Sequence, residues 1–363
     1  MSRILIFSDI HVAPHKKSKE RLNDCLEALE WVFKTAVAKK IEDIVFVGDL
    51  FHDRQKIDVL TYQKTFQIFQ EYVGPKRRVH LLLGNHDLWH LKKYDISSVF
   101  PLAAIEGVHV IDQPCTRVIA GHEMAFLPYT SDPEVDLKKI EFESKPASKI
   151  LFGHVAIDGA VWNVLHGTTA EVAVEHDGDM VKVDSSIFRG WDQVFLGHYH
   201  AEQKLDYNVE YIGSPLQLSF GEAFQKKHII VYDLENHDKE YIRNTFSPQH
   251  FIIPQADVEK YDLNNNFVRI VIEDIAASDL ADMRQEIMMK NDVGSLEMIP
   301  SRKKQDEADV HVIEDAKNIF LREEEMLEKY IEEIEKGVGL DGLDKDRLLE
   351  VGKSVLQPSE EES

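Results

Sequence analysis

The 363-residue sequence lacks the features that mark disulfide-stabilised, secreted and membrane-spanning proteins. It has only two cysteines, Cys25 and Cys115, which excludes a disulfide scaffold and a zinc site built from four thiolates. No apolar run approaches the ~20 residues that a membrane-spanning helix needs. The first residues turn polar too early for a secretory signal. We therefore expect a cytoplasmic protein that makes no use of a membrane and keeps both thiols reduced.

Positive charge is also scarce. Lys and Arg total 42 against 65 Asp and Glu, which gives a formal net charge of −23. This excludes a generally basic surface of the kind that binds nucleic acid through its phosphates. Much of the excess acidity lies in the last 50 residues, so a local site for a polyanion stays open. A composition with 43% hydrophobic and 29% charged residues is typical of a soluble globular protein, and the length indicates two or three domains.

Five short apolar runs organise the first 200 residues. Continuous runs of this length predict strands that are buried on both faces. Between the first three runs, a three- and four-residue spacing predicts helices, so we expect a strand–helix series with parallel pairing. The runs occupy residues 4–7, 44–47, 79–83, 150–152 and 194–196. The helical positions are Leu22, Leu26, Leu29, Phe33 and Val37, followed by residues 60–72.

The remaining sequence divides into segments of different character. Residues 108–246 read mostly as strands, with a hairpin at 176–179, so we interpret 1–247 as one mixed α/β layered domain. Residues 248–300 predict a smaller α/β unit: a connecting stretch with two prolines, then a strand at 267–272, a helix at 278–289 and a strand at 296–299. Residues 301–314 read as a polar linker. Residues 315–363 read as two acidic helical segments with a disordered end.

Polar residues that follow the five apolar runs are of metal-ligand types. On an extended strand, residues i and i+2 point to the same side, so Asp9 with His11, and His198 with His200, can each face one ion. Carboxylate, amide and imidazole groups without sulfur suit ions such as Mn²⁺, Fe²⁺ or Zn²⁺. Each motif alone is common as a surface feature, but the five together, at the carboxyl ends of strands, predict one shared site. The motifs are Asp9-x-His11, Gly48-Asp49, Gly84-Asn85-His86-Asp87, Gly153-His154 and Gly197-His198-x-His200.

This series resembles the calcineurin-like metallophosphoesterases, and within them the SbcD-type DNA nucleases and their phage recombination-nuclease relatives. The narrower resemblance rests on residues 48–52 (Gly-Asp-Leu-Phe-His) and 212–222, and it is firm over about 1–235. It implies a β-sandwich flanked by helices, with residues 248–300 as a capping domain. It also implies a homodimer and two divalent ions, Mn²⁺ by preference, with Mg²⁺, Fe²⁺ or Zn²⁺ as alternatives.

The resemblance assigns a role to each residue of the constellation. His86 would act in transition-state stabilisation or leaving-group protonation, and Asp87 would orient it, the alternative for Asp87 being a turn cap. Two ions held in this way lower the pKa of a water molecule and bind phosphate oxygens. One ion would be bound by Asp9, His11, Asp49 and His200. The other would be bound by Asp49, Asn85, His154 and His198.

Cationic and aromatic side chains near the metal motifs are candidates for DNA contacts. They could bind backbone phosphates without reading bases, although such loop residues are often merely solvated. Trp89 could stack on a base, but packing in the protein interior is the interpretation we favour. The candidates for DNA binding are His52, Arg54, Lys16, Lys17, Lys92 and Lys93.

The acidic tail has a narrow apolar stripe formed by Phe320, Leu327, Ile331 and Ile334. Such a stripe can pack internally or dock into a partner, and the resemblance implies an SbcC-type coiled-coil ATPase as the partner. We therefore predict a DNA exonuclease or endonuclease subunit for recombination, repair and end processing, in a bacterial or phage-infected cell. The alternatives are a small-molecule phosphodiesterase or phosphatase, and a scaffold without catalysis, although no expected ligand is missing.

Overall fold

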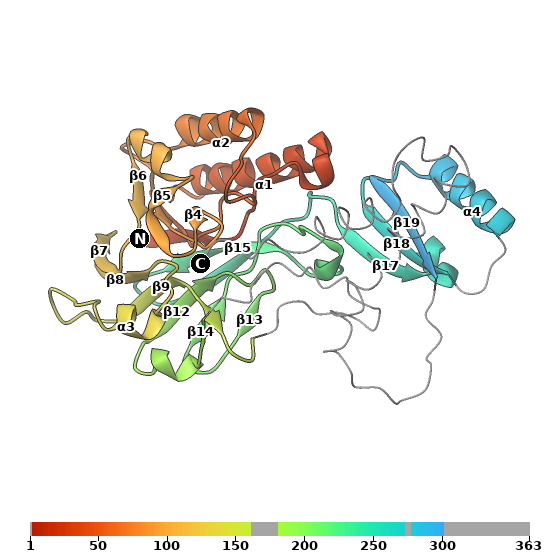
Figure 1. The fold of residues 1–363 in the computed structure, drawn as a ribbon. Helices are drawn as coiled ribbons and strands as arrows, with labels where there is room; N and C mark the ends of the chain where they lie inside the picture. Colours follow the sequence, from red (N-terminus) through yellow and green to blue (C-terminus); the bar gives the residue numbers. More distant parts are fainter. Residues whose placement is uncertain (1, 161–180, 273–276, 301–363) are drawn as a thin grey trace, which may run out of the picture. The chain divides into compact units, whose positions relative to one another are not determined.

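A computed structural model describes residues 2–160, 181–272 and 277–300 of the chain, and residues 1–301 form one compact unit (Figure 1). Two six-stranded sheets and one three-stranded sheet organise it. Among the described residues, no helix has the length and apolar character needed to cross a membrane.

The first large sheet contains the predicted parallel series. β1, β2, β3 and β6 pair in parallel, and β15 and β16 extend the sheet antiparallel on the other side of β1. The strand order is β16–β15–β1–β2–β3–β6. The strands are β1 (Arg3–Phe7), β2 (Asp43–Phe46), β3 (Arg78–Leu82), β6 (Val108–Ile111), β15 (His228–Asp233) and β16 (Lys239–Arg243).

Two helices connect the first three strands and lie next to each other in Figure 1: α1 (Lys19–Ala38) and α2 (Val59–Tyr72). Each begins with a side-chain cap: Ser18 accepts from the amide of Arg21, and Asp58 from that of Thr61. The apolar face of α1 is buried as predicted, with one exception. Val37 is 45% exposed, because Ala36, three residues after Phe33, takes the buried position in the last turn.

The second large sheet packs on the first. Its order is β13–β14–β12–β9–β8–β7, with parallel pairing from β14 to β8 and antiparallel edges. Between the sheets, Ile6 and Val45 pack with Phe126, Phe152 and Phe195. The predicted β-sandwich flanked by helices is therefore confirmed. The strands are β7 (Cys115–Ile119), β8 (His122–Leu127), β9 (Ile150–His154), β12 (Gln193–Gly197), β13 (Gln203–Lys204) and β14 (Val209–Tyr211).

The third sheet is parallel and consists of β17 (His250–Pro254), β18 (Phe267–Ile272) and β19 (Ser295–Pro300), with α4 (Ala277–Lys290) between the last two. The predicted strands and helix of this unit are confirmed. The connecting stretch that we expected at its start is wrong, because it contains β17. Pro254 ends this edge strand, where a proline costs no ladder hydrogen bond. The hairpin expected at 176–179 and the segments after residue 300 lie outside the described residues.

Short elements complete the described chain. The helical ones are η1 (His15–Lys17), η2 (Phe100–Ala104), α3 (Pro133–Leu137), η3 (Ser185–Phe188), η4 (Phe220–Glu222) and η5 (Gln255–Lys260). The short strands form a hairpin, β4 (Leu88–His90) with β5 (Lys93–Ser97), and a parallel pair, β10 (Ala156–Ile157) with β11 (Lys182–Val183).

Candidate metal centre

The loops after β1, β2 and β3 of one sheet meet the ends of β9 and β12 of the other. The backbone N–H of His198 donates to both carboxylate oxygens of Asp9, at 3.0 and 3.1 Å. Nδ1 of His154 lies 2.8 Å from the carbonyl oxygen of Val47. The structure thus brings motifs from both sheets to one place.

Glycine permits this close approach of the two sheets. A Cβ atom on Gly197 would overlap the carbonyl oxygen of Val47 and the hydroxyl of Ser8. One of these contacts is backbone and cannot rotate away, so a side chain would push β12 away from the loops after β1 and β2. Gly197 therefore has a structural role in bringing His198 to Asp9.

One group of candidate ligands contains Asp9, His11 and His200, whose donor atoms lie within 4.8 Å of one another. The Nε2 atoms of His11 and His200 are only 3.0 Å apart. Two ring nitrogens that approach so closely both point at the space a cation would occupy. All three residues belong to the set expected for one ion.

A second group contains Asp49, His154 and His198, again within 4.8 Å. Asn85 joins it, since its Oδ1 lies 3.0 Å from His154 Nε2 and 3.1 Å from His198 Nδ1. Asp49 connects the two groups: its Oδ2 is 3.5 Å from His11 Nε2 and 3.4 Å from His154 Nε2. This carboxylate is therefore in a position to be shared by two ions.

The donor set fits divalent cations. Asp9 and Asp49 are fully buried and are surrounded by imidazoles, and buried charges are normally paired or bound to metal. Burial raises the pKa of Asp9. Burial lowers the pKa of His154, but the neighbouring Asp49 outweighs this effect and raises it to about 9. Carboxylate, amide and imidazole donors without sulfur suit Mn²⁺, Fe²⁺ or Zn²⁺, and the same donors leave the choice among these ions open.

Four of the candidate ligands have left-handed backbone conformations. The φ angles are 51° at Asp9, 46° at His11, 63° at Asp49 and 103° at His198. Our argument that Asp9 and His11 face one ion because they lie on an extended strand is therefore wrong, since β1 ends at Phe7. The loop turns sharply at both residues instead. Such conformations are costly for residues other than glycine, and they concentrate at functional sites.

Buried polar residues hold His200 from behind. Its Nδ1 is 3.0 Å from Oε1 of Glu222, and Oε2 of Glu222 pairs with Nζ of Lys227 at 2.5 Å. Burial raises the pKa of Glu222, but Lys227 and His200 outweigh it and hold that pKa well below the usual range. This arrangement orients Nε2 of His200 toward the site.

Sequence reasoning gave neither Glu222 nor Lys227 a role. Glu222 belongs to the 212–222 stretch that carries the narrower resemblance, which is a usable signal. Lys227 gave none, because its burial, at 6% exposure, depends on contacts with Glu222 and Ser214 that only the fold creates.

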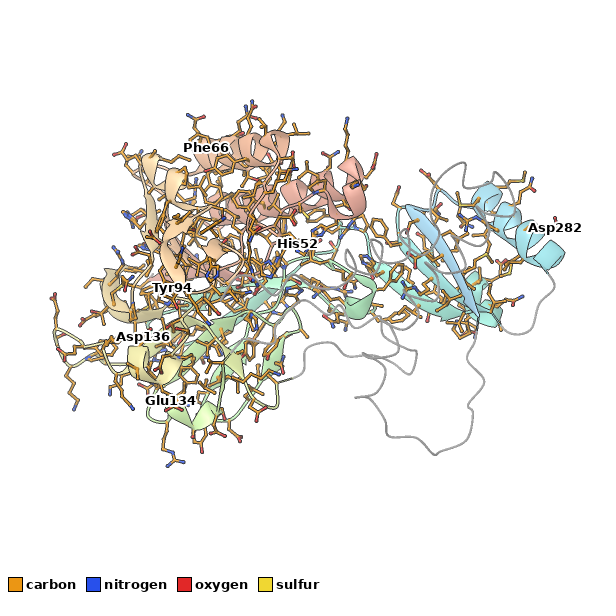
Figure 2. The ribbon with its side chains drawn as sticks, in the orientation of Figure 1. His52, Phe66, Tyr94, Glu134, Asp136 and Asp282 are labelled. Carbon is orange, nitrogen blue, oxygen red and sulfur yellow. The ribbon has the colours of Figure 1, made fainter. Side chains whose placement is uncertain are left out.

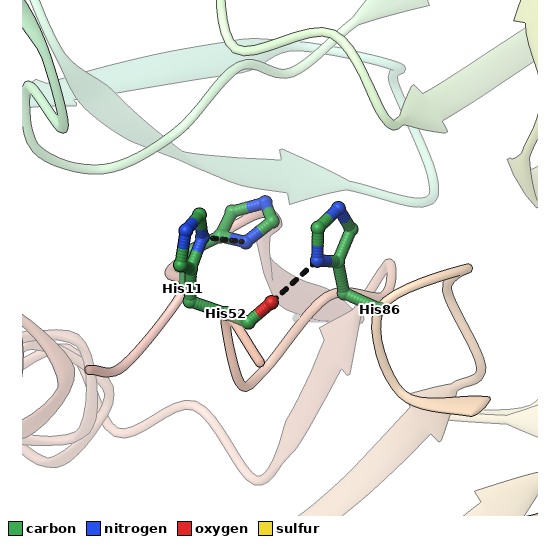
Figure 3. Close-up of side chains that lie close together, drawn as sticks. All are labelled: His11, His52 and His86. Carbon is green, nitrogen blue, oxygen red and sulfur yellow. Dashed lines mark hydrogen bonds between the residues drawn. The ribbon is translucent and has the colours of Figure 1, made fainter. Parts of the chain in front are cut away.

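His86 and His52 lie beside the first group (Figure 3). Nδ1 of His86 lies 2.6 Å from the carbonyl oxygen of His52, and the ring centroid of His86 is 4.7 Å from that of His11. His52 also approaches His11, with 3.4 Å between their Nδ1 atoms. His15, which we had not singled out, stacks on His52 at a centroid distance of 4.7 Å.

Asp87 does not take the place that we expected beside His86. Its two carboxylate oxygens accept hydrogen bonds from the backbone amides of Asp49, Leu50 and Gly84, each at 2.9 Å. The carbonyl of His52 bonds Nδ1 of His86 instead. The expected orienting role is therefore wrong, and Asp87 joins the loops after β2 and β3, close to the alternative of a turn cap.

The candidates for DNA binding are dispersed. Arg54 and Lys92 line one cavity, and Lys93 lies beside Trp89. Lys16 and Lys17 belong to η1, which does not line that cavity. Trp89 is 41% exposed, so the interpretation that it packs in the interior is wrong.

A two-sheet sandwich with Asp, Asn and His ligands at the carboxyl ends of its strands defines a metal-dependent phosphoesterase. The description "Calcineurin-like phosphoesterase" matches residues 2–202, and the chain belongs to this family.

Among characterised proteins, the chain is similar to exonuclease subunit 1 of enterobacteria phage T4. The two are 24% identical over 253 residues, which cover 69% of each chain. It is also similar to the SbcD protein of the SbcCD nuclease of Bacillus subtilis, at 25% identity over 64% of this chain and 66% of that protein. The SbcD protein of Staphylococcus epidermidis is 26% identical over 68% of this chain and 69% of that protein. The matches thus span about two thirds of each protein.

Proposed function

We propose that this protein is a DNA nuclease that hydrolyses phosphodiester bonds at a dinuclear metal site. The observation that carries the proposal is the pair of donor groups that share Asp49, with His86 beside them. Members of a phosphoesterase family need a substrate class, and the similar proteins named nuclease and exonuclease support DNA.

The residues divide into two ligand sets and one acid–base group. When bound, the ions supply Lewis acidity and a water of lowered pKa. His86 stabilises the transition state or protonates the leaving oxygen through Nε2, because Nδ1 is engaged by the carbonyl of His52. One ion is held by Asp9, His11, Asp49 and His200, and the other by Asp49, Asn85, His154 and His198. We propose Mn²⁺, with Mg²⁺, Fe²⁺ and Zn²⁺ as the alternatives.

The wider assembly is part of the same proposal. Residues 1–247 would form the nuclease domain and 248–300 a capping domain, with 301–314 as a linker. Residues 315–363 would bind the coiled coil of an SbcC-type ATPase through Phe320, Leu327, Ile331 and Ile334, which lie outside the described residues. We further propose a homodimer that acts in recombination, repair and end processing within the cytoplasm. The word "subunit" in the names of the similar proteins supports a partner.

The test compares substrates in Mn²⁺ with the full chain. Single- and double-stranded DNA and a small phosphodiester ester are each incubated with the wild type and with His86→Ala. We expect DNA cleavage that falls by about 10²- to 10⁴-fold in the variant, the usual contribution of a positioned acid or base. The matched control is His122→Asn, a histidine of β8 outside the donor groups.

Each alternative has its own outcome. Hydrolysis of the small ester without DNA cleavage would favour a small-molecule phosphodiesterase. Absence of any hydrolysis, together with retained binding to an SbcC-type ATPase, would favour a scaffold. DNA cleavage that His86→Ala leaves intact would mean that another residue or a contaminating nuclease is responsible.

A further inference from the structure

A cavity of about 260 Å³ lies among three segments that adjoin the candidate metal centre. Arg54 comes from the loop after β2, Trp89 and Lys92 from the β4–β5 hairpin, and Tyr129 and Ser131 from the segment after β8. We call this cavity the Trp89 pocket. Nothing in the proposed chemistry of the centre uses it.

The pocket is fixed close to the site by the chain itself. Arg54 follows His52 by two residues, and Trp89 follows His86 by three, so their Cα atoms are at most ~7 and ~11 Å apart. The amide of Tyr129 donates to the carbonyl of Leu83 at 2.8 Å, which ties the segment after β8 to the end of β3. A strand cut beside His86 would therefore pass the pocket within about three base steps, at ~3.4 Å each.

Hydrogen bonds also hold the hairpin against the segment after β8. The amide of Ser131 donates to the hydroxyl of Tyr94 at 2.9 Å, and that hydroxyl lies 3.2 Å from Oγ of Ser131. Tyr94 is labelled in Figure 2, where it marks β5. The walls of the pocket are therefore joined by specific contacts.

The lining combines an aromatic face with positive charge. Trp89 is 41% exposed, and Nζ of Lys93 lies 5.4 Å from its ring centroid. Among the described residues, Arg54, Lys92 and Lys93 form no ion pair, and the buried Nε of Arg54 has no hydrogen-bond partner. In a chain of net charge −23, three cations without carboxylate partners beside one exposed indole are a local exception. Stacking aromatics within a cationic groove are how proteins bind single-stranded nucleic acid.

The size of the pocket restricts the occupant. Its volume is below the ~300–1,000 Å³ of pockets that enclose drug-sized ligands, so it suits a single ring system. We propose that the Trp89 pocket holds one unpaired nucleobase of the strand being cut, stacked on Trp89, with an adjacent phosphate on Arg54 and Lys92. This inference rests on the proposed DNA nuclease function and specifies how that site would select frayed or single-stranded ends.

Binding in EDTA tests the pocket without hydrolysis. The full-length protein is titrated against labelled duplexes with a short single-stranded end, in which one position at a time is abasic. We expect one abasic position to weaken wild-type binding by about 10-fold, the order that loss of a base–aromatic stack produces. Trp89→Ala should weaken binding of the intact DNA similarly and remove the dependence on that position.

Two further variants make the test specific. Trp89→Phe keeps an aromatic face and should restore most of the binding. Phe246→Ala removes a similarly exposed aromatic, at 46% exposure, from outside the pocket and should bind like the wild type. Thermal melting of each variant checks that the fold is retained.

The outcomes separate this inference from the proposed function. Wild-type DNA cleavage in Mn²⁺ combined with unchanged binding by Trp89→Ala overturns the pocket but leaves the nuclease. Absence of wild-type cleavage of any DNA overturns the nuclease. Binding that no abasic position weakens, or free nucleoside monophosphate that competes as well as the oligonucleotide end, overturns a substrate base as the occupant.

Discussion

Substitution of Glu222 gives the sharpest test of how His200 is held. Glu222 is 1% exposed, and its two oxygens contact His200 Nδ1 at 3.0 Å and Lys227 Nζ at 2.5 Å. Removing one partner of a buried ion pair typically costs ~3–5 kcal/mol, because the other charge remains buried and unpaired. We therefore expect Glu222→Ala to lower the free energy of unfolding by about that amount in metal-free protein.

The same substitution should weaken metal binding by a separate mechanism. Nδ1 of His200 would lose the acceptor that orients its ring, and loss of such a partner usually reduces metal affinity by ~10- to 100-fold. Glu222→Gln keeps an oxygen near Nδ1 and should recover part of this affinity, whereas its stability should stay reduced beside Lys227. The double variant Glu222→Gln with Lys227→Met removes both charges and should be more stable than Glu222→Gln alone.

The measurements are urea denaturation in EDTA and calorimetric titration with Mn²⁺. The control is Glu202→Ala, a neighbouring carboxylate that pairs with His228 at 3.5 Å and is 39% exposed. If Glu222→Ala costs less than about 1 kcal/mol, the ion pair contributes little. If Glu222→Ala binds Mn²⁺ as tightly as the wild type, Glu222 does not position His200.

Three further predictions follow from the geometry. Gly197→Ala should destabilise the protein by about 1–3 kcal/mol and reduce Mn²⁺ binding, because its Cβ would overlap the Val47 carbonyl, whereas Gly74→Ala, with nothing within 4 Å, should do neither. Chelation should lower the melting temperature by the equivalent of ~2.7 kcal/mol if free Mn²⁺ was at 100 times its Kd, and Asp49→Asn, but not the exposed Asp53→Asn, should abolish this difference. Hydrogen bonds from His80 and Arg78 outweigh burial and lower the pKa of Asp43 to about 2. Asp43 therefore stabilises the folded state above pH ~4 by about 1–2 kcal/mol, discounted because Arg78 is 34% exposed, and this is lost between pH ~4 and ~2. Urea denaturation against pH should show the loss in the wild type and not in Asp43→Asn.

Local pattern predicted most of the strands and helices that form the sandwich. Continuous apolar runs such as 44–47 are buried between α1, α2 and the second sheet, so a run of one kind meets one environment. β17 was missed because its flanking prolines resemble loop signals, and only its edge position makes Pro254 harmless. Val37 was assigned to the buried face because the spacing allows either residue 36 or 37, and packing in the fold selects Ala36.

The candidate site was predictable in composition but not in geometry. The residue types after each strand named the donors, since strand order brings their carboxyl ends together. The left-handed turns at Asp9 and His11 could not be predicted, because neither is a residue type that signals such a turn on an apolar strand end. The place of Asp87 depends on amides from another loop, and the burial of Lys227 depends on Glu222; both are contacts between distant parts of the chain.

The distribution of buried charge argues that metal binding and folding are coupled in this protein. Lys227 balances Glu222, and three backbone amides bond Asp87, whose pKa is raised by burial to about 7. Asp9 and Asp49 differ, because in the described part of the chain no Lys or Arg forms an ion pair with either. Only neutral or partly protonated imidazoles face them, and two carboxylates buried in this way cost several kcal/mol. Divalent cations would supply the missing positive charge, so the metal-free protein should be the less stable and more pH-sensitive form.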